Sequence, residues 1–155
     1  YEEVQLTKLH PKYWSVTLIN LAIVFIVLGV ATSLVWYNAE ELSDYGLELL
    51  IGLAIIVVFT IFLNRIAFKK KAFAFRNHDV IYRSGIIATN TMVIPYNRVQ
   101  HVALHEGFIS RIFGLAKVEI FTAGGNSSDL EIPGIAKEEA ENIKQLLTGK
   151  IQKQL

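Results

Sequence analysis

The sequence has 155 residues, of which 52% are hydrophobic, and its formal net charge is +1 at pH 7. It contains no cysteine, which excludes a disulfide framework, a thiolate nucleophile and a cysteine-based zinc site. The apolar excess is concentrated before residue 69, and the remainder has the composition of an ordinary globular domain. Composition therefore predicts a membrane part followed by a globular part.

Two uncharged apolar runs occupy residues 16–37 and 49–63. At about 1.5 Å per residue, the first run gives a helix of about 33 Å, long enough to cross a hydrocarbon core. The second run is shorter, so we expect its span to cover residues 45–68, with Glu48 and Arg65 near the interfaces. The alternatives are a cleaved signal sequence and a buried helix pair. The second span that follows at once argues against the first, and the small chain against the second.

The charged residues predict the orientation of the two spans. Lys8 and Lys12 precede the first span and a basic cluster follows the second, whereas residues 38–44 hold three acidic residues and no Lys or Arg. Short loops rich in Lys and Arg stay in the cytoplasm. We therefore expect residues 1–15 and residues 69–155 to be cytoplasmic and the 38–44 loop to be external.

Short alternating segments separated by turn residues predict a β-rich domain at residues 69–155. The expected strands are residues 72–76, 80–84, 89–94, 99–105, 117–122 and 130–132. Residues 77–79 tolerate turn geometry and predict a hairpin, while Pro133 and Gly134 are expected to end the last strand. Residues 137–147 carry an apolar stripe at helical spacing, which predicts an amphipathic C-terminal helix.

Several motifs of this domain resemble a known family. Residues 93–102 read Val-Ile-Pro-Tyr-Asn-Arg-Val-Gln-His-Val, and residues 111–118 read Arg-Ile-Phe-Gly-Leu-Ala-Lys-Val. With Thr-Ala-Gly-Gly at 122–125 and Ile-Pro-Gly-Ile at 132–135, they resemble the bacterial PH-like membrane proteins of the YdbS-like family. The resemblance implies a membrane α + β fold in the bacterial inner membrane. In this fold, a two-helix transmembrane hairpin precedes a PH-like bent β-sheet or barrel with a C-terminal amphipathic helix.

Two further expectations concern the folding of this domain. Four apolar side chains are expected to form a turn that plugs the sheet: Phe108, Ile109, Ile112 and Phe113. The part of the chain from Lys71 onward is expected to fold alone.

Residue patterns argue against an enzyme. The serines of the domain lack a Gly-x-Ser-x-Gly context, and the glycine-rich loop at 124–128 lacks the lysine and helix start of a phosphate cradle. His101 and His105 are four residues apart, but on a strand they lie about 13 Å apart, too far to share a metal ion. We expect a non-enzymatic protein with no cofactor and no small-molecule substrate.

Basic residues beside the second span are the first candidate site. They are Arg65, Lys69, Lys70, Lys71, Arg76 and Arg83. The plainest interpretation is that the lysines only fix the topology. The alternative is that the set also holds the domain against anionic lipid, in keeping with 12 Lys and Arg against 8 Asp and Glu in residues 69–155. The Arg-x-Arg pair with which related eukaryotic domains bind phosphoinositides is absent, and nucleic-acid binding is not expected without an aromatic platform.

A protein partner is the second candidate ligand, either a second copy of the chain or another membrane protein. The candidate contact residues are His101, His105, Phe121 and Asn126. Phe121 points away from the face of Val118 and Ile120, so it is either an exposed anchor or packed beneath the 108–113 turn. Small residues in the spans favour close helix packing, within the pair or against a partner. These are Gly29, Ala31, Ser33, Gly52 and Ala54.

Overall fold

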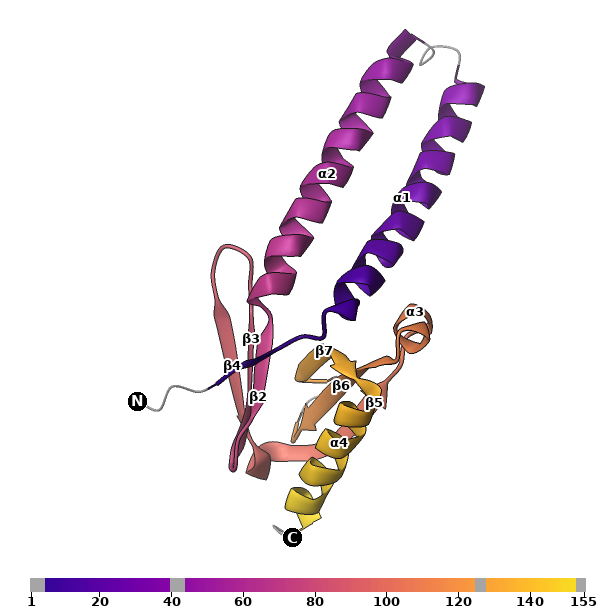
Figure 1. The fold of residues 1–155 in the computed structure, drawn as a ribbon. Helices are drawn as coiled ribbons and strands as arrows, with labels where there is room; N and C mark the ends of the chain where they lie inside the picture. Colours follow the sequence, from indigo (N-terminus) through magenta and orange to yellow (C-terminus); the bar gives the residue numbers. More distant parts are fainter. Residues whose placement is uncertain (1–4, 40–43, 125–127, 153–155) are drawn as a thin grey trace.

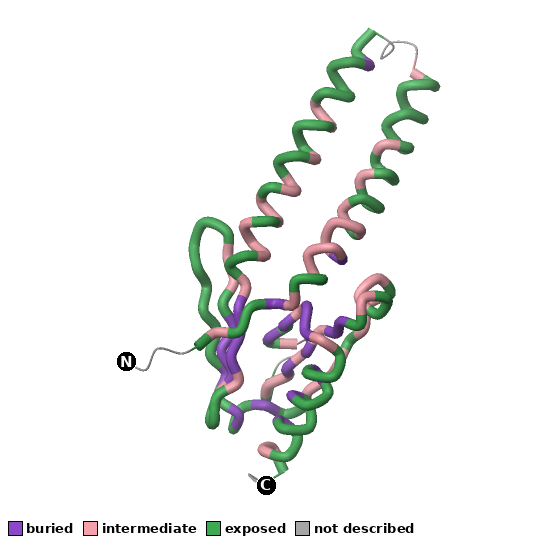
Figure 2. The backbone as a smooth tube through the Cα atoms, in the orientation of Figure 1, coloured by how far each residue is buried: buried purple, intermediate pink, exposed green. Residues whose placement is uncertain are grey.

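The computed structural model describes residues 5–39, 44–124 and 128–152. Two long helices, α1 (Lys12–Asn38) and α2 (Gly46–Lys70), form a hairpin that stands on a β-rich domain (Figure 1). Their most apolar stretches have mean hydropathies of 2.6 and 2.7, and only 0% and 6% of these stretches are buried (Figure 2). Such exposure is typical of lipid-facing helices and not of core helices. The helices match the predicted spans to within four residues at each end.

The described residues form two antiparallel sheets. The first has the order β1 (Thr7–Lys8), β2 (Ala72–Phe75), β3 (Asp79–Ser84) and β4 (Asn90–Pro95). The second has the order β5 (Val99–His105), β6 (Leu115–Thr122) and β7 (Leu130–Ala136). A short 3-10 turn, η2 (Tyr96–Arg98), joins the sheets, and α4 (Lys137–Gln152) follows the last strand. This confirms the predicted PH-like architecture, although the two sheets do not close into a barrel.

The hydrophobic core lies between the two sheets and beneath α4. Its members include Phe73, Val80 and Tyr82 of the first sheet, Val118, Ile120 and Ile132 of the second, and Ala140, Ile143 and Leu147 of α4. Burial of one large apolar side chain contributes about 1.5–3 kcal/mol. The apolar stripe predicted for the C-terminal helix therefore packs on the sheets as expected.

The first strand of the domain, β1, comes before the two helices in the chain. The sequence did not predict this strand. Thr7 pairs with Phe73 and Lys8 with Ala72, so β1 and β2 are neighbours in the sheet. The domain predicted at residues 69–155 therefore also contains residues from the segment predicted as 1–15. The helix pair is inserted between the first two strands of one domain. A strand of two residues is too short for an alternating pattern to reveal it.

The segment that links β1 to α1 is anchored in the domain. Leu9 belongs to the core and is 4% exposed, and the His10 N–H donates a hydrogen bond of 2.8 Å to the Gly134 carbonyl oxygen. Gly134 has a φ of 68°, and a Cβ on it would lie 2.6 Å from a ring carbon of Tyr13. Glycine thus permits both the backbone conformation of β7 and its close approach to the first turn of α1.

Strand β7 continues through Pro133, where the sequence predicted its end. The register shifts between Ala116 and Val118 of β6, so Pro133 and Gly134 both lie opposite Lys117. In such a bulge the extra residue is unpaired, and the missing N–H of proline interrupts no ladder hydrogen bond. The strand therefore runs on and leads directly into α4.

Of the four apolar residues expected to plug the sheet, three lie in a short helix outside it and Phe113 follows that helix. Helix α3 (Phe108–Ile112) contains no buried residue, and Phe108 and Ile112 are strongly exposed. It lies beside the start of α1 (Figure 1). The predicted plug was wrong because Leu9 and the apolar side of α4 supply the side chains that complete the core.

The place of β1 leads to a prediction about the part of the chain that begins at Lys71. A soluble chain of residues 71–152 should gain stability when residues 5–10 are joined to it by a short Gly/Ser linker that replaces the helix pair. In this linked chain, Leu9→Ala should lower the free energy of unfolding by about 2–3 kcal/mol, because a buried leucine is lost. Urea denaturation measures both effects.

Lys8→Ala is the matched control, because the Lys8 side chain, at the residue preceding Leu9, is exposed and its loss should cost less than about 0.5 kcal/mol. Equal stability of the linked and unlinked chains, or no effect of Leu9→Ala, would contradict the structural role of β1.

Candidate functional site

The two helices leave the domain at one end, around residues 9–12 and 69–72, which is the helix end of the domain (Figure 1). Here aromatic rings of α1 and α2 meet a guanidinium group. The ring centroids of Trp14 and Phe68 are 5.9 Å apart, and the Arg65 guanidinium lies 4.8 Å from the centroid of Trp14. A cation over a tryptophan face is attracted by the ring. These contacts hold the two helices together where they enter the domain.

Five of the six predicted lipid-surface cations lie at the helix end, and of these only Lys71 is half-buried. Arg65, Lys69 and Lys70 belong to the last turns of α2, and Arg83 of β3 pairs in register with Ala72 at the start of β2. All four cations are exposed. We name Arg65, Lys69, Lys70 and Arg83 the basic collar.

Two further cations stand near the collar. Lys8 pairs with Ala72 at the start of β2, and Lys12 is the first residue of α1. Both side chains are exposed. The sequence indicated them only as topology signals, because the pairing of β1 with β2 was not visible in it.

The other two predicted cations have different surroundings. The Lys71 N–H donates to the carbonyl oxygens of Ala67 and Phe68 and so ends α2. Its side chain is half-buried, and this burial lowers the pKa of the Lys71 ammonium. Arg76 follows β2 at the opposite end of the domain from the helices, so it does not join the basic collar (Figure 1).

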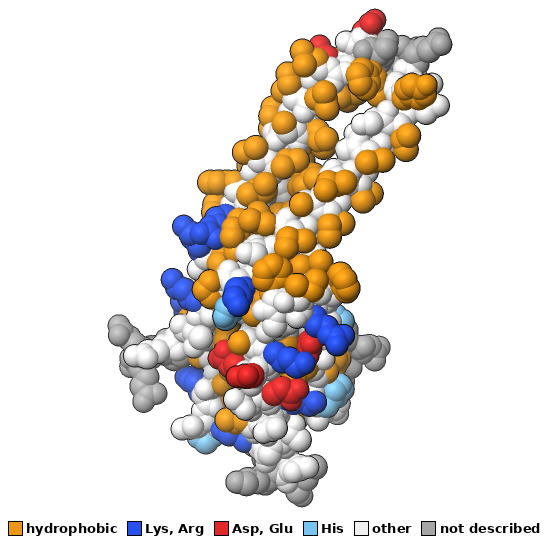
Figure 3. All heavy atoms as spheres, turned by 45° about the vertical axis from the view of Figure 1, so that its right-hand side comes forward, with side chains coloured by type: hydrophobic (Ala, Val, Ile, Leu, Met, Phe, Trp, Pro, Cys, Tyr) orange, Lys and Arg blue, Asp and Glu red, His pale blue; other side chains and the backbone are white. Residues whose placement is uncertain are grey.

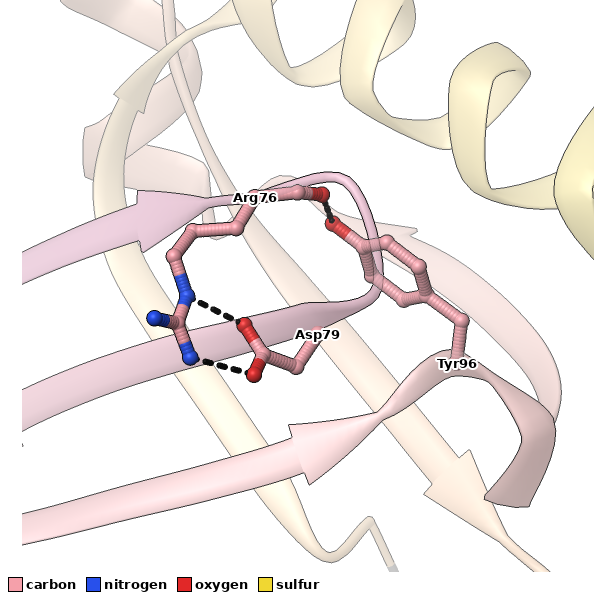
Figure 4. A network of polar contacts seen from close by, with 3 residues as sticks. All are labelled: Arg76, Asp79 and Tyr96. Atoms are coloured by element: carbon pink, nitrogen blue, oxygen red, sulfur yellow. Dashed lines mark hydrogen bonds and ion pairs between the residues drawn. The ribbon is translucent and has the colours of Figure 1, made fainter.

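At that far end, Arg76, Asp79 and Tyr96 form a polar network (Figure 4). The Nε of Arg76 donates to Oδ1 of Asp79 at 2.6 Å, and the Tyr96 hydroxyl donates to the Arg76 carbonyl oxygen at 2.6 Å. Burial, and secondarily the charge of Asp79, raise the pKa of Tyr96 to about 12, so this hydroxyl remains a donor at neutral pH. The network holds the turn between β2 and β3 against η2.

The predicted partner residues lie on the second sheet. The rings of His101 and Phe121 stack with centroids 4.2 Å apart, on neighbouring positions of β5 and β6. Phe121 is half-buried in this stack and lies near the opposite end of β6 from α3, so neither predicted arrangement is found. His105 is exposed opposite Lys117. Asn126 lies outside the described residues.

Charged side chains of β6 and β7 pair with one another. The Nζ of Lys117 lies 2.7 Å from a Glu119 oxygen and 2.9 Å from a Glu131 oxygen. Hydrogen bonds to these carboxylates raise the pKa of Lys117, and its ammonium lowers the pKa of Glu131. Asp129 accepts hydrogen bonds of 2.8 and 2.6 Å from the Thr122 N–H and hydroxyl, which lower the pKa of Asp129. This face is a salt-bridged surface whose charges satisfy each other.

Apolar residues at the helix end were missed as a possible site. Ile86 and Ile87 occupy the turn between β3 and β4, and Phe108 and Ile112 belong to α3. The signal was present in the sequence, since two isoleucines follow Gly85 at a position where hairpin turns normally carry polar residues. In the part of the chain that the structure describes, no three His, Cys, Asp or Glu side chains gather as a metal site.

Fold and site together define a membrane protein that carries a PH-like domain on two apolar helices. Residues 15–151 match the bacterial PH domain family, and the chain belongs to that family. It is 26% identical over 141 residues to "UPF0699 transmembrane protein YdbS" of Bacillus subtilis (strain 168), which covers 88% of this chain and 85% of that protein. It is 33% identical over 85 residues to "UPF0699 transmembrane protein YdbT" of the same organism, which covers 53% of this chain and 17% of that protein. No solved structure matches the chain.

Proposed function

We propose that this protein is a non-enzymatic membrane module whose PH-like domain is held against anionic lipid at the cytoplasmic face of the bacterial inner membrane. The observation that carries the proposal is the basic collar, which lies at the end of α2 and on the neighbouring β3, where the chain leaves the helix pair. A cation close to an anionic leaflet contributes about 1 kcal/mol to attraction. The module would respond to the negative charge of the surface.

The same charges support the cytoplasmic orientation. Lys8 lies before α1 and Lys12 begins it, the collar lies at the end of α2, and the 38–44 loop carries only acidic charges. The pairing of β1 with β2 brings both ends of the helix pair to the same domain. By the positive-inside rule, that domain and both termini belong in the cytoplasm.

The arrangement of the collar favours attraction to a charged surface over recognition of one headgroup. Arg65, Lys69 and Lys70 come from a helix and Arg83 from a strand, and all four are exposed to solvent. Exposed point charges of this kind attract any anionic lipid and are screened by salt. The proposed ligand is therefore the anionic leaflet, without a small-molecule substrate, cofactor or nucleic acid.

A second candidate function is that of an accessory subunit in a larger membrane complex. A Cβ added to Gly29 or Gly52 would meet no described atom of another helix or strand within 4 Å, so neither glycine is in close contact with the opposite helix. A hollow between the helices is lined by Gly29, Ser33 and Leu50, among others. Small residues let helices of different chains approach closely. They therefore favour packing against a second copy or another membrane protein.

The basic collar predicts a preference for anionic lipid around the full-length protein. In vesicles, spin-labelled phosphatidylglycerol should associate several-fold more strongly than spin-labelled phosphatidylcholine, and the preference should fall at high salt. The combined variant Lys69→Gln with Arg83→Gln should lose about half of the preference, because the collar loses two of its four charges. Electron paramagnetic resonance measures the motionally restricted fraction of each lipid.

Arg98→Gln with Lys144→Gln is the matched control, because both cations are exposed and lie outside the collar. If this control lowers the preference as much as the collar variant does, or if the wild-type protein shows no preference, the anionic-lipid function is wrong.

The open glycine positions predict assembly through the helices. In mild detergent, cross-linking should recover a homo-oligomer or a complex with a second membrane protein. Gly29→Leu should weaken this recovery because it fills the hollow, whereas Val27→Leu, at an exposed position of the same helix, should not. A monomer at micromolar concentration with no co-purifying membrane protein would contradict this second function.

A further inference from the structure

Large apolar side chains without protein cover gather at the helix end of the domain. Ile87 is 98% exposed, Phe108 81% and Ile112 67%, and Ile86 is also exposed. In the described part of the domain beyond α2, the other exposed large hydrophobic residues are Met92, Val93 and Leu146. Single exposed apolar residues are ordinary on soluble surfaces. Two exposed pairs at the same end of a domain call for a specific explanation.

The two exposed apolar pairs, Ile86 with Ile87 and Phe108 with Ile112, lie on either side of α1 and α2. The turn between β3 and β4 stands beside the last turns of α2, and α3 lies beside the start of α1 (Figure 1). The Lys70 ammonium donates a hydrogen bond to the Ile86 carbonyl oxygen, which ties the turn to the end of α2. Both elements therefore lie at the level where the helices enter the domain.

Each pair is carried by a defined element. Gly85 has a φ of 136°, and a Cβ there would lie 1.9 Å from the Ala88 carbonyl oxygen, so the tight turn requires glycine. This turn carries Ile86 and Ile87 at its tip. Helix α3 is held by the hydrogen bond from the Arg111 N–H to the Gly107 carbonyl oxygen, at 2.8 Å.

The surroundings of the two pairs match those of a membrane interface. Lys70 stands beside the first pair, and the exposed Arg111 lies within α3. Figure 3 shows apolar side chains continuing from the helices onto the adjoining end of the domain, with Lys and Arg side chains next to them. Apolar side chains bordered by cations are typical of segments that enter the boundary between headgroups and acyl chains.

We propose that the β3–β4 turn and α3 insert their apolar side chains into the lipid leaflet on the domain side of the membrane. Their occupant is the acyl-chain boundary of the bilayer that α1 and α2 span, because the turn contacts the end of α2 and α3 contacts the start of α1. This contact is apolar and does not depend on the charge of the lipid. It is therefore independent of the anionic-lipid function proposed for the basic collar.

The absence of cysteine from the chain permits a direct test with single labelled positions. Ile87→Cys and Ile112→Cys are labelled with a nitrobenzoxadiazole probe in the full-length protein, which is reconstituted in nanodiscs of neutral phosphatidylcholine. Lipids with a nitroxide near the headgroup should quench both probes several-fold more than probes at His78→Cys or Leu146→Cys. High salt should leave the quenching unchanged, because burial of apolar groups drives the contact.

A second set of variants shows whether the native side chains produce the insertion. Ile86→Ser with Ile87→Ser should lower the quenching of a probe at Thr89→Cys, whereas Met92→Ser with Val93→Ser, an exposed apolar pair on β4, should not. Probes at positions 87 and 112 that are quenched no more than the probe at position 78 would overturn the proposal. So would quenching at position 89 that is the same in both serine variants.

Discussion

The pairing of β1 with β2 is the constraint on which the rest of the structure depends. The chain leaves the domain after β1, forms α1 and α2, and returns as the neighbouring strand. Because neighbouring strands lie about 4.8 Å apart, the two helices must begin and end close together on the same side. The helix pair is therefore connected to the PH-like domain at both of its ends, by β1 before α1 and by β2 after α2.

This constraint gives the domain a fixed membrane-facing end. Leu9 in the core and the contact of Tyr13 with Gly134 attach α1, while the capping of α2 by Lys71 leads at once into β2. Short, well-packed connections leave little room for rotation of the domain about the helices. The basic collar, the β3–β4 turn and α3 are in this way presented together at the end where the helices leave the domain. The far end, closed by Arg76, Asp79 and Tyr96, is directed away from the helices (Figure 1).

Sequence patterns predicted the elements well where the pattern was long. Both long helices follow from the length of their uncharged apolar runs, and most strand positions and α4 follow from the periodicity of their apolar residues. The short β1 carries no such pattern, and Pro133 lies within β7 because a bulge relieves the ladder there. The sequence could not show which predicted cations lie near the helices. Arg76 follows β2 and lies at the far end, whereas Arg83 lies in β3, opposite the start of β2 and near the helices. The apolar residues of α3 were predicted to lie in the core. The structure shows instead that Leu9 and the apolar side of α4 fill the core, so the side chains of α3 stay outside it.

Disulfide trapping of β1 against β2 in native membranes tests most directly whether the domain is built around the helix pair. Lys8 and Ala72 are direct partners, and antiparallel partners have Cα separations of about 4.5–5.5 Å, within the range of a disulfide. In Lys8→Cys with Ala72→Cys, mild oxidation of the folded protein should remove both thiols from later reaction with a polyethylene-glycol maleimide in SDS, and a reductant should restore them. Lys8→Cys with His78→Cys, which joins β1 to the far end, should keep both thiols reactive. If the two pairs react equally after oxidation, β1 does not belong to the sheet and the helix pair is not inserted in the domain.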